Sequence, residues 1–174
     1  MKTAVFLDRD GVLNDVVVRD GQPGSPHSLE QFRPTADLPA ILRLGAAGLL
    51  VFIITNQPDV ARGCVTPSVQ LAMLDRIRSV VPVDDFRICM HDDSQPCDCR
   101  KPKPGMILDL ARFWRVDLGR SFVVGDTWRD MGAARAAGCW SILIRRPYND
   151  GVMADAYADT LTGAVDLVLE QRGG

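Results

Sequence analysis

The sequence predicts an α/β fold, in which a mainly parallel sheet is covered by helices on both faces as a three-layer α/β/α sandwich. Apolar runs such as 4–7 (AVFL) and 49–54 (LLVFII) do not alternate with polar residues, which is typical of strands buried on both faces. Longer amphipathic stretches separate these runs, and this alternation favours a parallel sheet. The 174 residues fit a single domain spanning 1–174.

Local signals place each element in turn. Gly48 closes the first helix, and Thr66 caps the second, which has Pro67 at its first position. Pro104 opens the third helix. Expected strands lie at 4–7, 49–54, 86–89, 121–124 and 140–144. Expected helices lie at 37–47, 67–80, 104–114, a stretch after 126 that ends at 138, and 161–170.

Composition and charge narrow the possible functions. The chain carries 20 Lys and Arg against 22 Asp and Glu, and it has no basic stripe of the kind that binds nucleic acid or a membrane surface. The four apolar residues before Asp8 are fewer than the roughly 7–15 of a signal peptide. No run approaches the roughly 20 apolar residues of a membrane span. We therefore expect a cytoplasmic, monomeric protein that acts on a small molecule.

Polar residues follow four of the expected strands at the point where each strand ends. They are Asp8, Thr55, the segment 89–91 and Asp126. In open parallel sheets, ligands bind beyond the carboxyl ends of the strands. The sequence therefore predicts a functional site at one edge of the sheet.

The segment Asp8-Arg9-Asp10-Gly11 directly follows the first strand. A carboxylate at a strand end can act as a nucleophile, and a second one two residues later can give and take a proton. Gly11 permits a sharp turn that brings backbone N–H groups near an anion. A turn-capping Asp8 with a solvated Asp10 is the alternative, and this segment alone does not decide between the two.

A cation and an anion could both be held at this edge. Asp8 and Asp126 could bind one Mg²⁺ from two strand ends, and Asp130 follows one helical turn after Asp126. The Thr55 hydroxyl and the Lys101 ammonium could neutralise the oxygens of a phosphoryl group in transfer. Taken alone, Asp126 could instead cap a helix and Lys101 could be a solvated charge.

Three of the five cysteines cluster with a histidine between 89 and 99. Cys89, His91, Cys97 and Cys99 form a complete set of four N/S ligands, which is typical of a structural Zn²⁺ site. We interpret 89–99 as a zinc loop that the metal orders. Of the remaining candidates, Cys64 and Cys139 are expected to be small apolar fillers, and His27 is expected to be solvated.

Four segments in order, FLDRDGVLN, IITNQ, CRKPKPG and VVGDTWRDMGAARAAG, resemble the four motifs of the haloacid dehalogenase superfamily. The resemblance covers 7–144 and implies a Rossmann-like fold without a cap domain, Mg²⁺ and an aspartyl-phosphate intermediate. Asp10 matches the acid/base residue that the dehalogenases lack, so the resemblance favours phosphate-ester hydrolysis. The implied roles are nucleophile for Asp8, general acid/base and carbonyl ligand of Mg²⁺ for Asp10, phosphoryl binding for Thr55 and Lys101, Mg²⁺ binding for Asp126, and support of that site for Asp130.

The zinc loop is similar to that of one branch, which holds the histidinol-phosphate phosphatases and the D-glycero-D-manno-heptose 1,7-bisphosphate 7-phosphatases. The segment TNQPDVARG looks most like the heptose enzymes. The resemblance places four residues on the substrate side: Asn56, Gln57, Arg62 and Arg100.

A heptose bisphosphate is therefore the preferred substrate, and histidinol phosphate remains an alternative. A polynucleotide 3′-phosphatase is disfavoured by the acidic balance. A zinc-stabilised binding module without catalysis is disfavoured by the intact set of Asp8, Asp10, Lys101 and Asp126.

Overall fold

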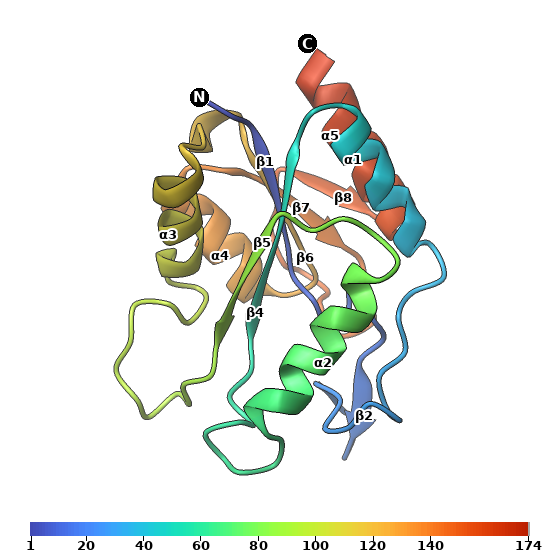
Figure 1. The fold of residues 1–174 in the computed structure, drawn as a ribbon, viewed down its shortest axis with the longest axis vertical. Coiled ribbons are helices and arrows are strands. Elements are labelled where there is room, and N and C mark those ends of the chain that lie inside the picture. The colour runs from blue at the N-terminus through green and yellow to red at the C-terminus, as the bar shows by residue number, and fades with distance from the viewer. Residues whose placement is uncertain (174) are drawn as a thin grey trace.

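A parallel sheet forms the centre of the molecule in the computed structural model, which describes residues 1–173. The strands are β1 (Ala4–Leu7), β4 (Leu50–Asn56), β5 (Asp85–Cys89), β6 (Phe122–Gly125), β7 (Trp140–Ile144) and β8 (Ala156–Ala158). They lie in the order β5-β4-β1-β6-β7-β8, and each neighbouring pair is parallel (Figure 1). The predicted parallel sheet is therefore confirmed.

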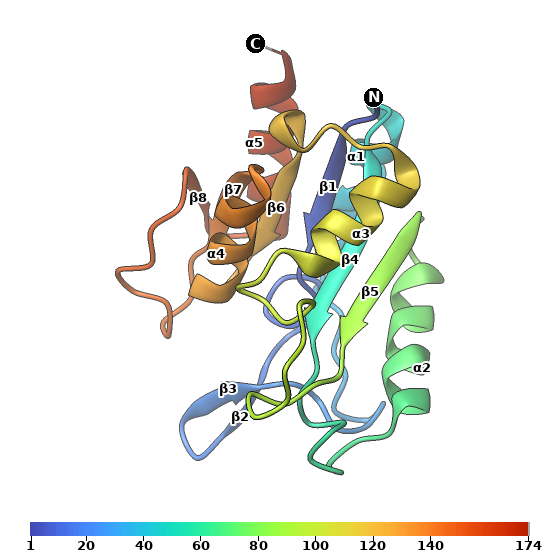
Figure 2. The same cartoon turned by 90° about the vertical axis from the view of Figure 1, so that its left-hand side faces the viewer.

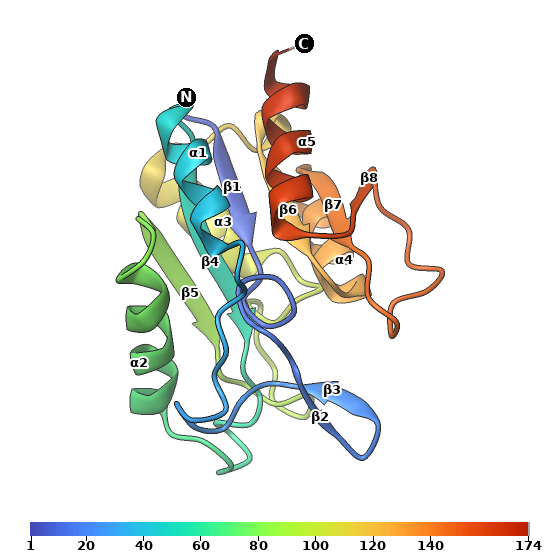
Figure 3. The same cartoon turned by 90° about the vertical axis from the view of Figure 1, so that its right-hand side faces the viewer.

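Helices cover both faces of the sheet, which confirms the three-layer sandwich. One face carries α3 (Gly105–Trp114) and α4 (Trp128–Ala137), which lie in front of the sheet in Figure 2. The other carries α1 (Leu42–Ala46), α2 (Pro67–Arg78) and α5 (Leu161–Gly173), which Figure 3 shows from their own side. None of these helices is both long and apolar enough to cross a membrane.

Successive side chains of β1 point to opposite faces of the sheet and belong to two separate hydrophobic clusters. Val5 and Leu7 pack with the residues of α1, α2 and α5, whereas Ala4 and Phe6 pack with those of α3 and α4. All four side chains are fully buried, as expected for a strand with helices on both sides. The buried core fixes the register of β1, so the residue that follows it, Asp8, has a defined position at the sheet edge.

The structure differs from the sequence prediction in several short elements. A hairpin of β2 (Val17–Arg19) and β3 (Gln22–Gly24) follows β1, and β8 adds a sixth strand to the sheet. Each of these strands has three residues, too few for a hydrophobic period to show. The helix expected at 37–47 begins instead as a 3₁₀ helix (Leu38–Ile41) that contains a proline in its first turn. A second 3₁₀ turn (Leu118–Arg120) precedes β6.

Candidate active site

The carboxyl ends of β1, β4 and β6 bring the predicted polar residues together. Asp8 follows β1, and its Oδ1 lies 2.8 Å from Nζ of Lys101. The same ammonium lies 2.6 Å from Oδ1 of Asp130 and donates to the carbonyl of Ile54 over 3.0 Å. Lys101 is 3% exposed and Asp130 is completely buried, so this is an ion pair shielded from water.

Burial and charge set the protonation of this group. Burial raises the pKa of Asp8 well above its usual value, with Asp130 adding to the shift and Lys101 opposing it. Burial alone would lower the pKa of Lys101, but the neighbouring charges of Asp130 and Asp8 outweigh it and raise that pKa. Lys101 therefore remains a cation, and its charge works against the rise in the pKa of Asp8, in favour of the ionised form that a nucleophile requires.

Asp126 faces Asp8 and fits a divalent cation. Oxygen atoms of Asp8, Asp126 and Asp130 all lie within 4.8 Å of one another. Within the described residues, Oδ1 of Asp126 is buried and has no hydrogen-bond partner. Burial raises the pKa of Asp126 to about 7, and Asp130 adds to the shift. An orphaned oxygen among crowded carboxylates is the donor set that Mg²⁺ prefers.

Gly11 forms the floor beside this cation site. Its φ is +83°, and a Cβ built there would lie 1.9 Å from Oδ2 of Asp126. A side chain at this position would displace the carboxylate. Glycine is therefore required at position 11 for two reasons: the positive φ of the turn and the close approach of the backbone to Asp126.

Two residues that hold Asp126 were not predicted from the sequence. Tyr148 donates its hydroxyl hydrogen bond to Oδ2 of Asp126, and Asn149 donates to the Asp126 carbonyl over 2.7 Å. Both lie in the loop after β7, where no hydrophobic period or motif marks them. Tyr148 leaves only Oδ1 of Asp126 unpartnered, and so orients the carboxylate towards the cation site.

Asp10 is surrounded by donors. Its Oδ1 accepts hydrogen bonds from Arg9 over 3.1 Å and from Asn14 over 2.9 Å. Its Oδ2 accepts hydrogen bonds from Ser25 and Gln57, both over 2.7 Å. Burial works to raise the pKa of Asp10, but the Arg9 guanidinium and these hydrogen bonds outweigh it and lower the pKa. Asp10 is therefore a carboxylate at rest.

Arg9, to which the sequence analysis gave no role, forms an ion pair with Asp10. It is completely buried and also donates to Gln70 of α2. A buried arginine is costly unless it is paired. Its carboxylate partner is therefore held in one orientation.

The end of β4 contributes three predicted residues with different surroundings. Thr55 is buried, and its hydroxyl accepts from Gln57 over 2.8 Å. Asn56 exchanges two 3.0 Å hydrogen bonds with the backbone of Lys101, which fixes the start of that segment. Gln57 was expected on the substrate side, but it is completely buried and does not line the pocket. Its amide instead donates to Asp10, because the chain turns inward after β4.

A pocket of about 340 Å³ opens above Asp8 and is rimmed by charged side chains. The predicted residues Arg62 and Arg100 line it, together with Arg129, which was not predicted. Arg62 binds Asp92 of the zinc loop, with 2.5 Å between Nε and Oδ2, and Arg100 binds Asp93 over 2.8 Å. A larger hollow of about 810 Å³ lies beside the β2–β3 hairpin. It lacks Asp8 and Lys101, so we place the chemistry in the smaller pocket.

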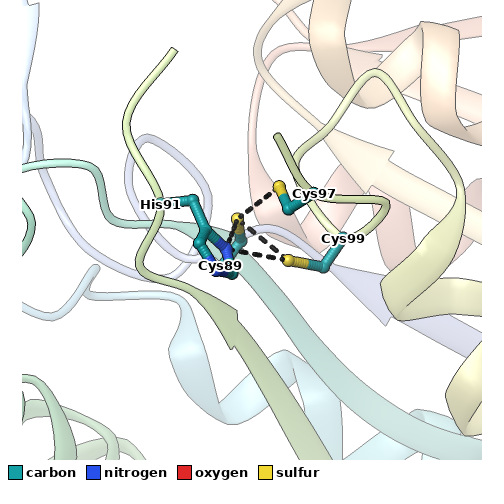
Figure 4. Close-up of side chains that lie close together, drawn as sticks. All are labelled: Cys89, His91, Cys97 and Cys99. Atoms are coloured by element: carbon teal, nitrogen blue, oxygen red, sulfur yellow. Dashed lines mark hydrogen bonds between the residues drawn. The ribbon is translucent and has the colours of Figure 1, made fainter. Parts of the chain in front are cut away.

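The predicted zinc ligands converge at the end of β5. Cys89 and His91 leave this strand, and Cys97 and Cys99 lie on the returning loop (Figure 4). Sγ of Cys89 lies 3.2 Å from Sγ of Cys99 and 3.9 Å from Sγ of Cys97. Nδ1 of His91 lies 3.5 Å from the sulfur of Cys89. The four ligand atoms are therefore close enough together to surround one ion with Zn–S bonds of about 2.3 Å.

The chemistry of the cluster also fits a cation. Burial raises the pKa of Cys99 to about 12, and the adjacent thiols of Cys89 and Cys97 add to the shift. Three sulfurs this close ionise together only with a positive charge between them. Gly105 packs directly against the backbone of the loop, since a Cβ there would lie 2.1 Å from the Asp98 carbonyl oxygen.

Two expectations for lone residues were wrong. Cys64 is exposed and is not an apolar filler, whereas Cys139 is buried as expected. His27 is not simply solvated, because its Nε2 lies 2.8 Å from Oδ2 of Asp59 and its side chain is 26% exposed.

Together the fold and the site define a class of enzyme. An aspartate at a strand end, a buried lysine beside it and a second aspartate with an orphaned oxygen are the parts needed for phosphoryl transfer at a divalent cation. The chain is an α/β phosphatase.

Comparisons with known proteins narrow this class. Residues 98–170 match the HAD-hydrolase-like family. The D-glycero-beta-D-manno-heptose-1,7-bisphosphate 7-phosphatase of Rhodopseudomonas palustris is 44% identical over 79% of this chain and 80% of its own. The corresponding alpha-anomer enzyme of Mycobacterium tuberculosis is 35% identical over 97% and 93%.

A solved structure agrees with these relatives. The D,D-heptose 1,7-bisphosphate phosphatase of B. bronchiseptica, complexed with magnesium and phosphate, superposes with a TM-score of 0.84 at 32% identity. The match covers 98% of this chain and 99% of the other. The chain belongs to the heptose-bisphosphate phosphatase family of HAD-like hydrolases.

Proposed function

We propose that this phosphatase removes the 7-phosphate of D-glycero-D-manno-heptose 1,7-bisphosphate. The Asp8–Lys101 pair facing the orphaned oxygen of Asp126 is the observation that carries the proposal, because it supplies a nucleophile, a phosphate-binding cation and a metal ligand within one pocket. Relatives that act on both anomers of this substrate, at 35–44% identity, support the choice of sugar.

Asp8 is the proposed nucleophile. The backbone N–H of Arg9 and the ammonium of Lys101 both approach Oδ1 of Asp8, at 2.7 and 2.8 Å. These contacts orient Oδ2 for in-line attack on phosphorus, which would form an aspartyl-phosphate and release the sugar oxygen. Thr55 and Lys101 would hold the transferred oxygens.

Asp10 is the proposed acid and base. In its protonated form it would donate to the departing sugar oxygen. The resulting carboxylate would then accept a proton from the water that hydrolyses the aspartyl-phosphate. Its lowered pKa makes the carboxylate the major form at rest, so the first step draws on the less populated protonated form.

Asp8 and Asp126 would hold a Mg²⁺ ion, which would neutralise charge on the phosphoryl oxygens. The predicted use of the Asp10 carbonyl as a further ligand is part of this proposal. Asp130 would act through Lys101 and Thr127, which take up both of its carboxylate oxygens.

The rim arginines would bind the sugar and its remaining phosphate. Arg62 and Arg100 are the predicted pair. Asn56 would contribute by fixing the backbone of Lys101, the residue that follows Arg100. Both guanidiniums already pair with carboxylates of the zinc loop. A phosphate could replace these exposed partners at low cost, since such pairs contribute little in water.

We also propose that Cys89, His91, Cys97 and Cys99 hold one structural Zn²⁺. Such a closed site leaves no position for water, so its role would be to set the loop that carries Lys101. Elemental analysis of protein purified without chelator should find about one zinc per chain. Fully active protein with almost no zinc would contradict the assignment.

Phosphate release from a panel of substrates tests the function. The panel holds both anomers of the heptose bisphosphate, histidinol phosphate and a 3′-phosphorylated DNA, and ³¹P spectra of the product show which phosphate has left. We expect loss of the 7-phosphate with the highest kcat/KM in the panel. Faster hydrolysis of histidinol phosphate, or loss of the 1-phosphate, would overturn the proposal.

A further inference from the structure

Three donors of the kind that bind zinc lie together beside the pocket, which one of them, Asp59, lines, and apart from the sulfur cluster. His27, Asp59 and Cys64 each offer one ligand atom, and these atoms all lie within 4.8 Å of one another. Nε2 of His27 lies 2.8 Å from Oδ2 of Asp59. The proposed hydrolysis uses none of the three.

Two separate segments build this cluster. His27 lies in the loop after β3, whereas Asp59 and Cys64 lie in the turn between β4 and α2. The backbone N–H of Cys64 donates to the carbonyl of Asp59 over 2.9 Å, so the turn itself brings these two residues together. Gly63, with φ +73°, allows the turn to close.

We propose that His27, Asp59 and Cys64 form a second Zn²⁺ site, open to solvent, at the rim of the active-site pocket. An imidazole, a carboxylate and a thiolate are all zinc ligands, and three protein ligands leave a fourth position for water. On binding, Cys64 gives up its thiol proton to solvent and forms the Zn–S bond.

The geometry of Asp59 lets the ion bind without disturbing the substrate side. Asp59 presents Oδ2 to His27, whereas its Oδ1 lies 3.2 Å from Nη1 of Arg62. A zinc ion on Oδ2 therefore replaces one hydrogen bond to His27 and leaves the pair with Arg62 in place. With three ligands and partial exposure, this site binds zinc more weakly than the closed loop of cysteines.

Zinc at this position would connect the two segments that hold Asp10. Ser25, two residues before His27, donates to Oδ2 of Asp10 over 2.7 Å. Gln57, two residues before Asp59, donates to the same oxygen over 2.7 Å. An ion that links His27 to Asp59 thus fixes both donors relative to each other, and with them the carboxylate of Asp10.

Alkylation of Cys64 tests the site directly. Protein with its sulfur loop filled and with saturating Mg²⁺, which keeps zinc off the aspartates, is treated with iodoacetamide with and without micromolar Zn²⁺. Peptide mapping then reports each cysteine. We expect zinc to slow modification of Cys64 by about tenfold or more in the parent, because the bound thiolate is no longer free to react.

The His27→Ala variant keeps Cys64 and should lose this protection. Asp75→Asn, which removes an exposed carboxylate on α2 outside the cluster, should keep it. Equal protection of Cys64 in the parent and in His27→Ala would overturn the site, as would no protection in the parent. Because the side chains of His27 and Asp75 are 26% and 73% exposed, both variants can fold, and circular dichroism checks this.

Amide hydrogen exchange tests the link to Asp10. Zinc should slow exchange in segments 24–28 and 57–64 of the parent and leave both unchanged in Cys64→Ser. Protection of Cys64 without slower exchange in 24–28 would overturn the connection of the two segments. None of these measurements uses substrate, so their outcome is independent of the proposed hydrolysis.

Discussion

The charges beside Asp8 and the charges at the mouth of the pocket are held in opposite ways. Lys101 and Asp130 are 3% and 0% exposed, and each is bound to fixed partners. Arg62 and Asp93 are 43% and 62% exposed, and each has more than one charged partner. The buried group cannot rearrange without leaving a charge unpaired, so it suits a constant chemical step, whereas the rim can exchange partners and so suits recognition of the substrate.

The largest effect should come from the nucleophile of the buried group. Asp8→Asn should lower kcat by about 10⁴-fold or more, because a neutral amide cannot form the aspartyl-phosphate. The measurement is phosphate release, with thermal melting on the same sample to show that the fold persists. Activity within tenfold of the parent would remove Asp8 from this role.

Lys101→Met should lower the free energy of unfolding far more than a matched change of an exposed lysine does. Removal of one partner of a buried ion pair typically costs about 3–5 kcal/mol, and Asp8 and Asp130 would both lose their counter-charge. Urea unfolding at pH 8 measures the change. Lys103→Met is the matched control, since this neighbouring lysine is 56% exposed and should change stability little. Equal losses in both variants would contradict the contrast between buried and exposed charges.

Asp10→Asn should slow turnover by about 10²–10⁴-fold, the usual contribution of a positioned acid or base. The substrate still meets Asp8 and Lys101, so KM should remain close to that of the parent. Steady-state kinetics separate the two constants, and Asp15→Asn, an exposed carboxylate nearby, serves as control. A loss confined to KM would show that Asp10 binds substrate and does not transfer protons.

The predictability of these regions follows from how each is built. Asp8, Thr55 and Asp126 follow buried strands, so their meeting at one edge could be predicted from apolar runs and parallel topology. Tyr148 could not be predicted, because it reaches Asp126 from a loop without any periodic pattern. The burial of Gln57 was also missed, since a sequence does not show which way a polar residue turns after a strand ends.

Motif spacing also predicted the sulfur cluster, because four ligands within eleven positions must lie close together. The cluster of His27, Asp59 and Cys64 joins two distant segments, and no spacing rule marks it. The β2–β3 hairpin that precedes His27 was itself too short to predict. The ends of parallel strands were therefore sufficient to predict the inner site, and local spacing to predict the sulfur loop, whereas the cluster of His27, Asp59 and Cys64 depends on tertiary contacts.

A pH dependence should appear in metal binding by the buried group. Asp126, with a pKa raised to about 7 from 3.8, must lose its proton to bind Mg²⁺. Below pH 7 the apparent Mg²⁺ affinity should therefore fall by up to about tenfold per pH unit. Calorimetric titration in buffers of different ionisation enthalpy measures the released proton. A proton release that persists in Asp126→Asn would assign it to another group.

The same shift predicts the stability of the metal-free protein. The folded carboxyl of Asp126 binds its proton more tightly than the unfolded one does, so protonation stabilises the fold. This contribution is complete below about pH 4 and is lost as the pH rises through about 7. Added Mg²⁺ should therefore raise the melting temperature more at pH 8 than at pH 5.5.

The smallest effect on the fold should come from the rim. Arg62→Ala removes exposed contacts to Asp59, Asp92 and Asp93, so the unfolding midpoint should not change measurably. KM for the bisphosphate should rise by about tenfold, the usual contribution of one hydrogen bond between charged groups, with kcat nearly unchanged. Arg43→Ala removes an equally exposed ion pair, to Asp166 of α5, and should alter neither constant. A fall in kcat with unchanged KM would place Arg62 with the buried group, in the chemical step, and would remove the division between the two regions.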